Sequence, residues 1–167
     1  MNNKTRELTL SGMFLAFGII VPYIFHIANL GGPIFLPMHI PVLLAAFYVN
    51  PIYAFSIGFL APLLNSILTG MPVLYPIAII MSFELGAYGL ITAIIYKKSN
   101  LLLALISGMI GGRVVAGLVV FILQSSFGLK MNPLLYLKGA LITGMPGIVI
   151  QIVLIPVIAK KFKIKSI

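Results

Sequence analysis

The 167-residue sequence contains no cysteine and only two acidic residues. The absence of cysteine excludes disulfide bonds, thiolate nucleophiles and thiolate metal ligands. Charged residues make up 8% of the chain and hydrophobic residues 61%, and the mean hydropathy is +1.19. A soluble domain of this size carries far more charge. The composition therefore predicts an all-α integral membrane protein, in which one domain over residues 1–167 forms about six transmembrane helices.

The sequence also lacks the Gly-x-x-x-x-Gly-Lys-Ser/Thr pattern of a phosphate-binding loop. Any ATP hydrolysis must therefore occur on another subunit, and we expect no cofactor on this chain. The formal net charge of +9 does not indicate nucleic-acid binding, because the basic residues gather at the ends of apolar segments. At those positions they orient helices and contact anionic membrane lipid.

Six apolar segments are predicted, separated by Gly, Pro, Asn or Lys residues. They cover residues 8–27, 35–49, 52–68, 73–96, 101–123 and 134–159. The apolar run of the first segment is longer than the core of a signal peptide, so we expect a retained helix. The second segment is short and has Pro37 and Pro41 near its start. It therefore predicts an irregular stretch that is covered by protein.

Six spans place both termini on one side of the membrane, and the basic residues indicate which side. Eight basic residues fall on the side of the termini and two on the other: Lys4, Arg6, Lys97, Lys98, Lys160, Lys161, Lys163 and Lys165 against Lys130 and Lys138. Since positive residues are enriched in cytoplasmic loops, we expect both termini to be cytoplasmic.

Arg113 lies inside an apolar segment, about 12 residues or roughly 18 Å from its cytoplasmic start. A guanidinium at this depth is costly unless it faces protein, water or an anion. Glu84, which we interpret as the only acid outside the N-terminal tail, is predicted at a similar depth in the preceding segment. Arg113 is therefore a candidate for binding a ligand carboxylate. The alternative is an internal ion pair with Glu84, and both roles can be combined.

Three further polar residues are candidate ligand contacts. Asn65 and Tyr75 are predicted near the outer membrane surface, where the alternatives are an interhelical hydrogen bond and an interfacial aromatic ring. His39 lies between the two prolines of the second segment, and the alternative there is a hydrogen bond to the backbone of the adjoining loop. A metal site is not expected, because His26 is the only other histidine and no carboxylate cluster accompanies the pair.

Small residues mark two possible packing surfaces. Gly12 and Ala16 share one face of the first segment, which predicts either internal packing or a smooth surface for a partner helix. Four glycines surround Arg113, and close helix packing is their expected role. They are Gly108, Gly111, Gly112 and Gly117.

Four stretches, taken together with the length and the six predicted helices, resemble a known family. They are residues 36–47 (LPMHIPVLLAAF), 64–76 (LNSILTGMPVLYP), 81–89 (MSFELGAYG) and 111–117 (GGRVVAG). The chain resembles the substrate-binding S components of energy-coupling factor (ECF) vitamin transporters, and within them the pantothenate-specific group.

The resemblance implies a multi-pass protein of the bacterial cell membrane that captures a small water-soluble vitamin from outside. It also implies two kinds of partner: a transmembrane coupling protein (EcfT-like) and two ATPase subunits that hydrolyse the ATP. S components dock on the coupling protein through their first helix, often with an Ala-x-x-x-Ala pair, and the corresponding positions here are Gly12 and Ala16. Pantothenate is a small carboxylate with hydroxyls and an amide, which suits one deep arginine and several neutral hydrogen-bonding groups.

Two other functional classes are alternatives to an S component. A self-contained secondary transporter for a small organic anion would use Glu84 as a proton carrier and Arg113 as its partner. An intramembrane enzyme would need a nucleophile and a base at the same depth, and Glu84 with scattered serines makes a poor set. The sequence therefore predicts a transport subunit that is not an enzyme.

Overall fold

The computed structural model describes residues 3–161, and its elements are helical. In chain order they are α1 (Asn3–Ile27), α2 (Gly32–Phe35), α3 (His39–Ala45), α4 (Pro51–Thr69), the short π-helix η1 (Leu74–Ala78), α5 (Ile79–Tyr96), α6 (Leu101–Phe127) and α7 (Pro133–Lys161). Lys163 and Lys165, which contribute to the expected charge bias, lie outside the described residues.

Five of the predicted spans are helices that are long and apolar enough to cross a membrane. They are Lys4–Ile27, Pro51–Thr69, Leu74–Tyr96, Leu101–Phe127 and Pro133–Lys161. Many of their large apolar side chains point outward; Ile52 and Ile142, for example, are 73% and 74% exposed. Such a surface suits contact with lipid. The all-α membrane fold predicted from the sequence is confirmed.

The second predicted span, residues 35–49, is irregular, as expected. It runs from the last residue of α2 through a break at Leu36–Met38 into α3, and turns follow Ala45. One of the six predicted transmembrane helices is therefore a short, interrupted one. Proline disfavours a right-handed helical conformation in the residue before it, so α2 does not continue through Leu36, which is left-handed with φ 51° and ψ 49°. Pro41 is tolerated because it falls in the first turn of α3, where backbone N–H groups lack intrahelical partners.

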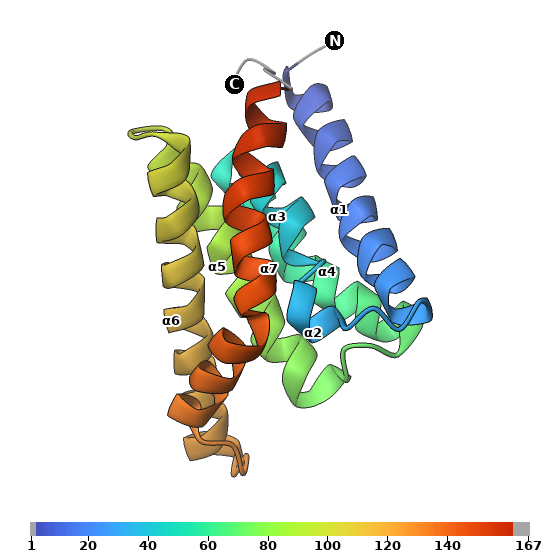
Figure 1. Cartoon of the computed structure of the whole chain (residues 1–167), viewed down its shortest axis with the longest axis vertical. Coiled ribbons are helices and arrows are strands. Elements are labelled where there is room, and N and C mark those ends of the chain that lie inside the picture. The colour runs from blue at the N-terminus through green and yellow to red at the C-terminus, as the bar shows by residue number, and fades with distance from the viewer. Residues whose placement is uncertain (1–2, 162–167) are drawn as a thin grey trace.

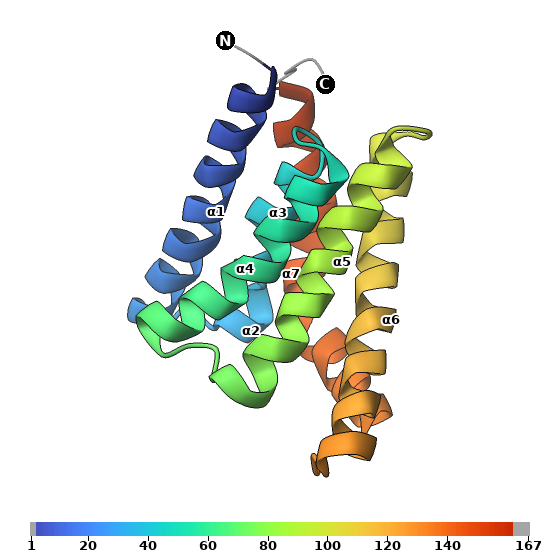
Figure 2. The ribbon, with the colours of Figure 1, turned by 180° about the vertical axis from the view of Figure 1, so that it is seen from behind.

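The start of α1, the end of α7 and the α5–α6 connection all lie at one end of the molecule, which is called the terminal end below (Figure 1). Viewed from behind, α4 crosses the molecule obliquely between α1 and α5, and α6 packs on the far side of α5 (Figure 2). The short helix α3 packs against α1, α4, α5 and α7, whereas α2 packs mainly against α7 and has no buried residue.

Glycines allow α4, α5 and α6 to pack backbone against backbone. A Cβ atom at Gly58 of α4 would collide with the carbonyl group of Leu85, and one at Gly112 of α6 would collide with the ring of Tyr88. The close packing expected for the glycines around Arg113 is present, since a Cβ at Gly108 or Gly112 has no room.

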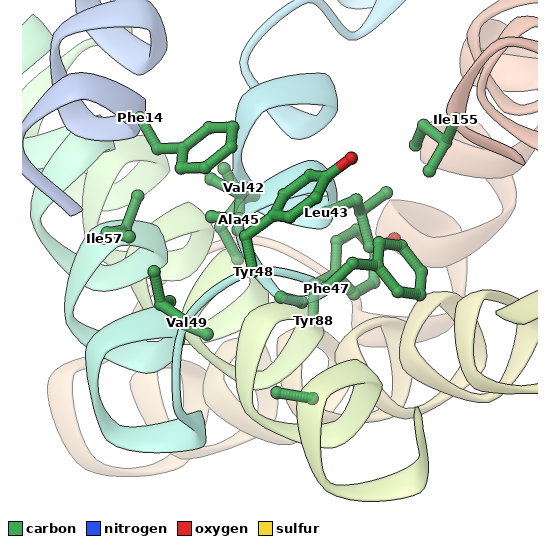
Figure 3. Packing of buried hydrophobic residues seen from close by; sticks show 14 of the residues in the cluster. Phe14, Val42, Leu43, Ala45, Phe47, Tyr48, Val49, Ile57, Tyr88 and Ile155 are labelled. Atoms are coloured by element: carbon green, nitrogen blue, oxygen red, sulfur yellow. The ribbon is translucent and has the colours of Figure 1, made fainter. Parts of the chain in front are cut away.

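The apolar core surrounds α3 on the side toward the terminal end. It includes Phe14 from α1, Val42 and Leu43 from α3, Tyr88 from α5 and Ile155 from α7, all of which converge in Figure 3. These side chains are at most 7% exposed. The core therefore fixes α3, and with it the position of the residue at its first turn, His39.

Glu7 is part of the fold and does not lie in a tail. It belongs to α1, is 7% exposed, and accepts a hydrogen bond of 3.2 Å from Asn50 Nδ2. Asn50 Oδ1 in turn accepts from the backbone N–H groups of Ile52 and Tyr53 at the start of α4. This arrangement ties α1 to α4 at the terminal end, which corrects the interpretation of Glu7 as a tail residue.

Candidate functional site

A cavity of about 650 Å³ opens at the end opposite the terminal end. It is lined by the last turns of α1 and α4, by the α2–α3 break, and by parts of α5, α6 and α7. Its polar lining residues are His26, His39, Asn65, Thr69, Glu84, Arg113, Tyr136 and Thr143. This size falls within the range typical of sites for small organic ligands, about 300–1,000 Å³.

An ion pair lies at the wall formed by α5 and α6. Arg113 Nη1 is 2.6 Å from Glu84 Oε1, and the two side chains are 12% and 2% exposed. The close approach of α6 to α5 brings them together, because a Cβ at Gly112 would lie 2.8 Å from the carbonyl oxygen of Glu84. The internal pair proposed from the sequence is therefore present, and both of its members line the cavity.

Arg113 retains hydrogen-bonding capacity beyond this pair. Its Nε and Nη2 atoms are buried and have no hydrogen-bond partner among the described residues. Nη2 lies against α7 where Gly144 leaves space, 3.6 Å from the position of a Cβ built on that glycine. A guanidinium has five N–H donors, and leaving buried donors unpaired costs about 1–3 kcal/mol each. A ligand that supplied acceptors to this cation would recover part of that cost.

His39 completes a three-residue cluster with Glu84 and Arg113. Its Nε2 atom is 4.0 Å from Glu84 Oε1, and its ring is 5.3 Å from that of Tyr88. The residue is 2% exposed, and neither ring nitrogen has a hydrogen-bond partner among residues 3–161. The expected covered path of this segment is present, because Pro37, Met38 and His39 are all buried.

Asn65 lines the cavity and also joins two helices. Its Nδ2 atom donates to the carbonyl oxygens of Gly18 on α1 and Ala61 on α4, at 2.8 and 2.9 Å. Its Oδ1 atom has no partner among the described residues. The interhelical hydrogen bond expected as one alternative is therefore present, and the carbonyl oxygen of the same side chain is buried without a partner among the described residues.

The tyrosine in the cavity wall is not the predicted one. Tyr75 is 47% exposed and is not among the cavity-lining residues, whereas Tyr136 of α7 is. A sequence signal for Tyr136 exists: Tyr136, Ala140 and Thr143 recur at helical spacing on one face of α7, and all three line the cavity. The neighbouring apolar residues obscured this pattern.

The face of α1 that carries Gly12 and Ala16 points away from the rest of the described chain. Both residues are exposed, and a Cβ built at Gly12 meets no atom within 4 Å. Gly18, by contrast, packs on Ala61 of α4. Gly12 and Ala16 therefore do not take part in internal packing, and their surface is free for a contact outside this chain.

The family described as "ECF transporter, substrate-specific component" matches residues 6–159. The chain belongs to this family. Comparisons with curated proteins and with solved structures give no match. This S component is thus a membrane-embedded transporter subunit and not an enzyme, and its family works with EcfT and ATPase subunits on a small-molecule substrate.

Proposed function

We propose that this S component captures a small water-soluble vitamin carrying a carboxylate, with pantothenate as the best candidate. The observation that carries the proposal is the position of Arg113 in the wall of the cavity, with two buried nitrogen atoms that have no hydrogen-bond partner within residues 3–161. Charge-assisted hydrogen bonds from a guanidinium to a carboxylate are among the strongest polar contacts in proteins. Glu84 orients the guanidinium, and the ligand carboxylate supplies further acceptors.

Other lining groups suit the remaining parts of such a ligand. Asn65 offers a free carbonyl oxygen, and His39, Tyr136 and Thr143 offer polar atoms around a largely apolar wall. Hydroxyl and amide groups of a pantothenate-like molecule would find partners among them. The proposed contacts do not include Tyr75, because that residue lies outside the cavity lining.

The proposal includes an orientation and a docking surface. With both termini cytoplasmic, as the basic residues indicate, the cavity opens to the outside, where the vitamin is captured. The exposed small-residue face of α1 at Gly12 and Ala16 is then the surface for the transmembrane coupling protein. ATP hydrolysis takes place on the two ATPase subunits of the complex.

The test is calorimetric titration of the purified protein with a panel of water-soluble vitamins. We expect one ligand to bind with a Kd in about the nanomolar range, equivalent to about −12 kcal/mol. R113A should weaken binding by about 2–5 kcal/mol, or roughly 30-fold to several thousand-fold. Lys138 is the matched control, because it is an exposed cation on α7 outside the cavity lining, and K138A should bind normally.

A folded R113A protein with unchanged affinity would refute the role of Arg113. A self-contained secondary transporter is distinguished by reconstitution in liposomes. The proposed function requires the coupling protein, the ATPases and ATP for uptake, so gradient-driven uptake by this chain alone would contradict it.

A further inference from the structure

The charges around the cavity balance before any ligand enters. Glu84 and Arg113 cancel, and the remaining ionisable lining residues are two histidines and one tyrosine. The ionisable groups that face or neighbour His39 are Glu84 and Tyr88 from α5, Arg113 from α6, Tyr136 from α7 and His26 from α1. The residues of α4 that line the cavity are Asn65 and Thr69, and both are uncharged.

A carboxylate ligand disturbs this balance. The ligand carboxylate would be a second anion beside Arg113, whose Nη1 atom already lies 2.6 Å from Glu84 Oε1. Glu84 is 1% exposed, so water screens the repulsion between the two carboxylates poorly. Two carboxylates that share a buried site do not both remain ionised unless a further positive charge joins them. The geometry offers one group for that charge, since His39 Nε2 lies 4.0 Å from Glu84 Oε1.

We propose that the site binds its carboxylate ligand together with one proton, and that His39 receives this proton. The inference rests on the proposed function, because it requires a carboxylate ligand at Arg113. The proton comes from bulk water and adds to a ring nitrogen of His39, which gives an imidazolium beside Glu84. Glu84 then has two cationic neighbours, and Arg113 can share its N–H donors with the ligand. The cluster and ligand together carry no net charge.

His39 fits this role better than the second histidine of the cavity. His26 is exposed at the last turn of α1 and forms no ion pair with an acid among the described residues. His39 is 2% exposed, and both of its ring nitrogens lack hydrogen-bond partners in the part of the chain that the structure describes. A proton on His39 would thus be stabilised by Glu84, whereas a proton on His26 would be solvated. H26N is therefore the matched control for H39N.

The experiment is titration calorimetry with pantothenate in buffers of different ionisation enthalpy, which counts the protons taken up on binding. For the wild type we expect about one proton per ligand near neutral pH, and a Kd that falls about tenfold for each unit decrease in pH. H26N changes a cavity-lining residue and is a control for the proton count alone, which should stay at about one. H39N should bind more weakly and take up no proton. E84Q should also take up none, because without the second carboxylate Arg113 pairs with the ligand alone. Panthenol, in which a hydroxymethyl group replaces the carboxylate, should bind weakly and without proton uptake.

The outcomes separate this inference from the proposed function. Pantothenate binding by the wild type without proton uptake would overturn the inference and leave the proposed function intact. Continued uptake in H39N, or its loss in H26N, would also overturn it. If H39N does not fold, H39Q repeats the test of His39 by the same proton count, and continued uptake in E84Q would also overturn the inference. Failure of every vitamin in the panel to bind would refute the proposed function and this inference with it.

Discussion

We predict that the Glu84–Arg113 ion pair is needed for ligand binding and not for the stability of the fold. Variants that remove the charge of Glu84 alone, and of both residues together, test this prediction. The pair is buried, with side chains 2% and 12% exposed. E84L leaves the guanidinium without its anion in an apolar wall, and removing one partner of a buried pair costs about 3–5 kcal/mol. For a chain of this length that corresponds to a fall in Tm of roughly 6–20 °C.

The double variant E84L/R113M should recover this loss. Replacing both members of a buried ion pair by apolar residues is often neutral, or stabilising by about 1–4 kcal/mol, because the desolvation cost disappears together with the attraction. We therefore expect its Tm in detergent to equal or exceed that of the wild type, while vitamin binding is lost. K138M, which changes an exposed cation at the same end of the protein, should alter stability by less than about 0.5 kcal/mol.

The assay is thermal unfolding of purified protein in detergent, followed by the fraction that remains monodisperse, with ligand binding measured in parallel. A double variant as unstable as E84L would refute the reasoning, because the pair would then be a structural requirement. A double variant that is stable and still binds the vitamin would remove the pair from the site.

Three further predictions concern individual residues. Y136F should weaken vitamin binding by about 0.5–1.5 kcal/mol if its hydroxyl bonds the ligand, whereas Y75F should leave the titration unchanged, because Tyr75 lies outside the cavity. G112A should lower the Tm by forcing α6 away from α5, since its Cβ meets the Tyr88 ring, and binding should weaken as the Arg113 guanidinium shifts. Replacing the exposed Gly12 and Ala16 by leucine should preserve vitamin binding but abolish co-purification with the coupling protein, and intact co-purification would argue against docking at this face.

The long helices could be predicted because apolar runs and the residues that bound them are recognised from neighbouring positions in the sequence. Residues 52–68, for example, form a mostly apolar run that starts after Asn50 and Pro51 and is followed by Thr69 and Gly70, and α4 follows these bounds closely. The ion pair was also predictable, since one acid and one cation at similar depth in apolar segments have few alternatives.

The residues that sequence reasoning missed depend on contacts between distant segments. Tyr136 lines the cavity because α7 packs against α2 and α6, and its helical spacing with Ala140 and Thr143 does not by itself show that this face of α7 meets a cavity. Glu7 appeared to belong to a tail because only the fold brings Asn50 within hydrogen-bond distance of its carboxylate. Asn65 could not be assigned to one role, and the structure shows why: its amide nitrogen holds α1 while its carbonyl oxygen stays free.

The break in the second span connects the fold to the site. The residues of the break, Leu36, Pro37 and Met38, line the cavity. Pro37 disfavours continuation of α2, and the left-handed Leu36 redirects the chain at a cost of about 1–2 kcal/mol. The Leu36 side chain packs where Gly144 of α7 has no Cβ, which helps to hold this conformation. The same break starts α3 at His39, and the core around α3 then fixes that imidazole beside Glu84. The irregular segment therefore lines the cavity and positions His39, which we propose is protonated when the ligand carboxylate binds.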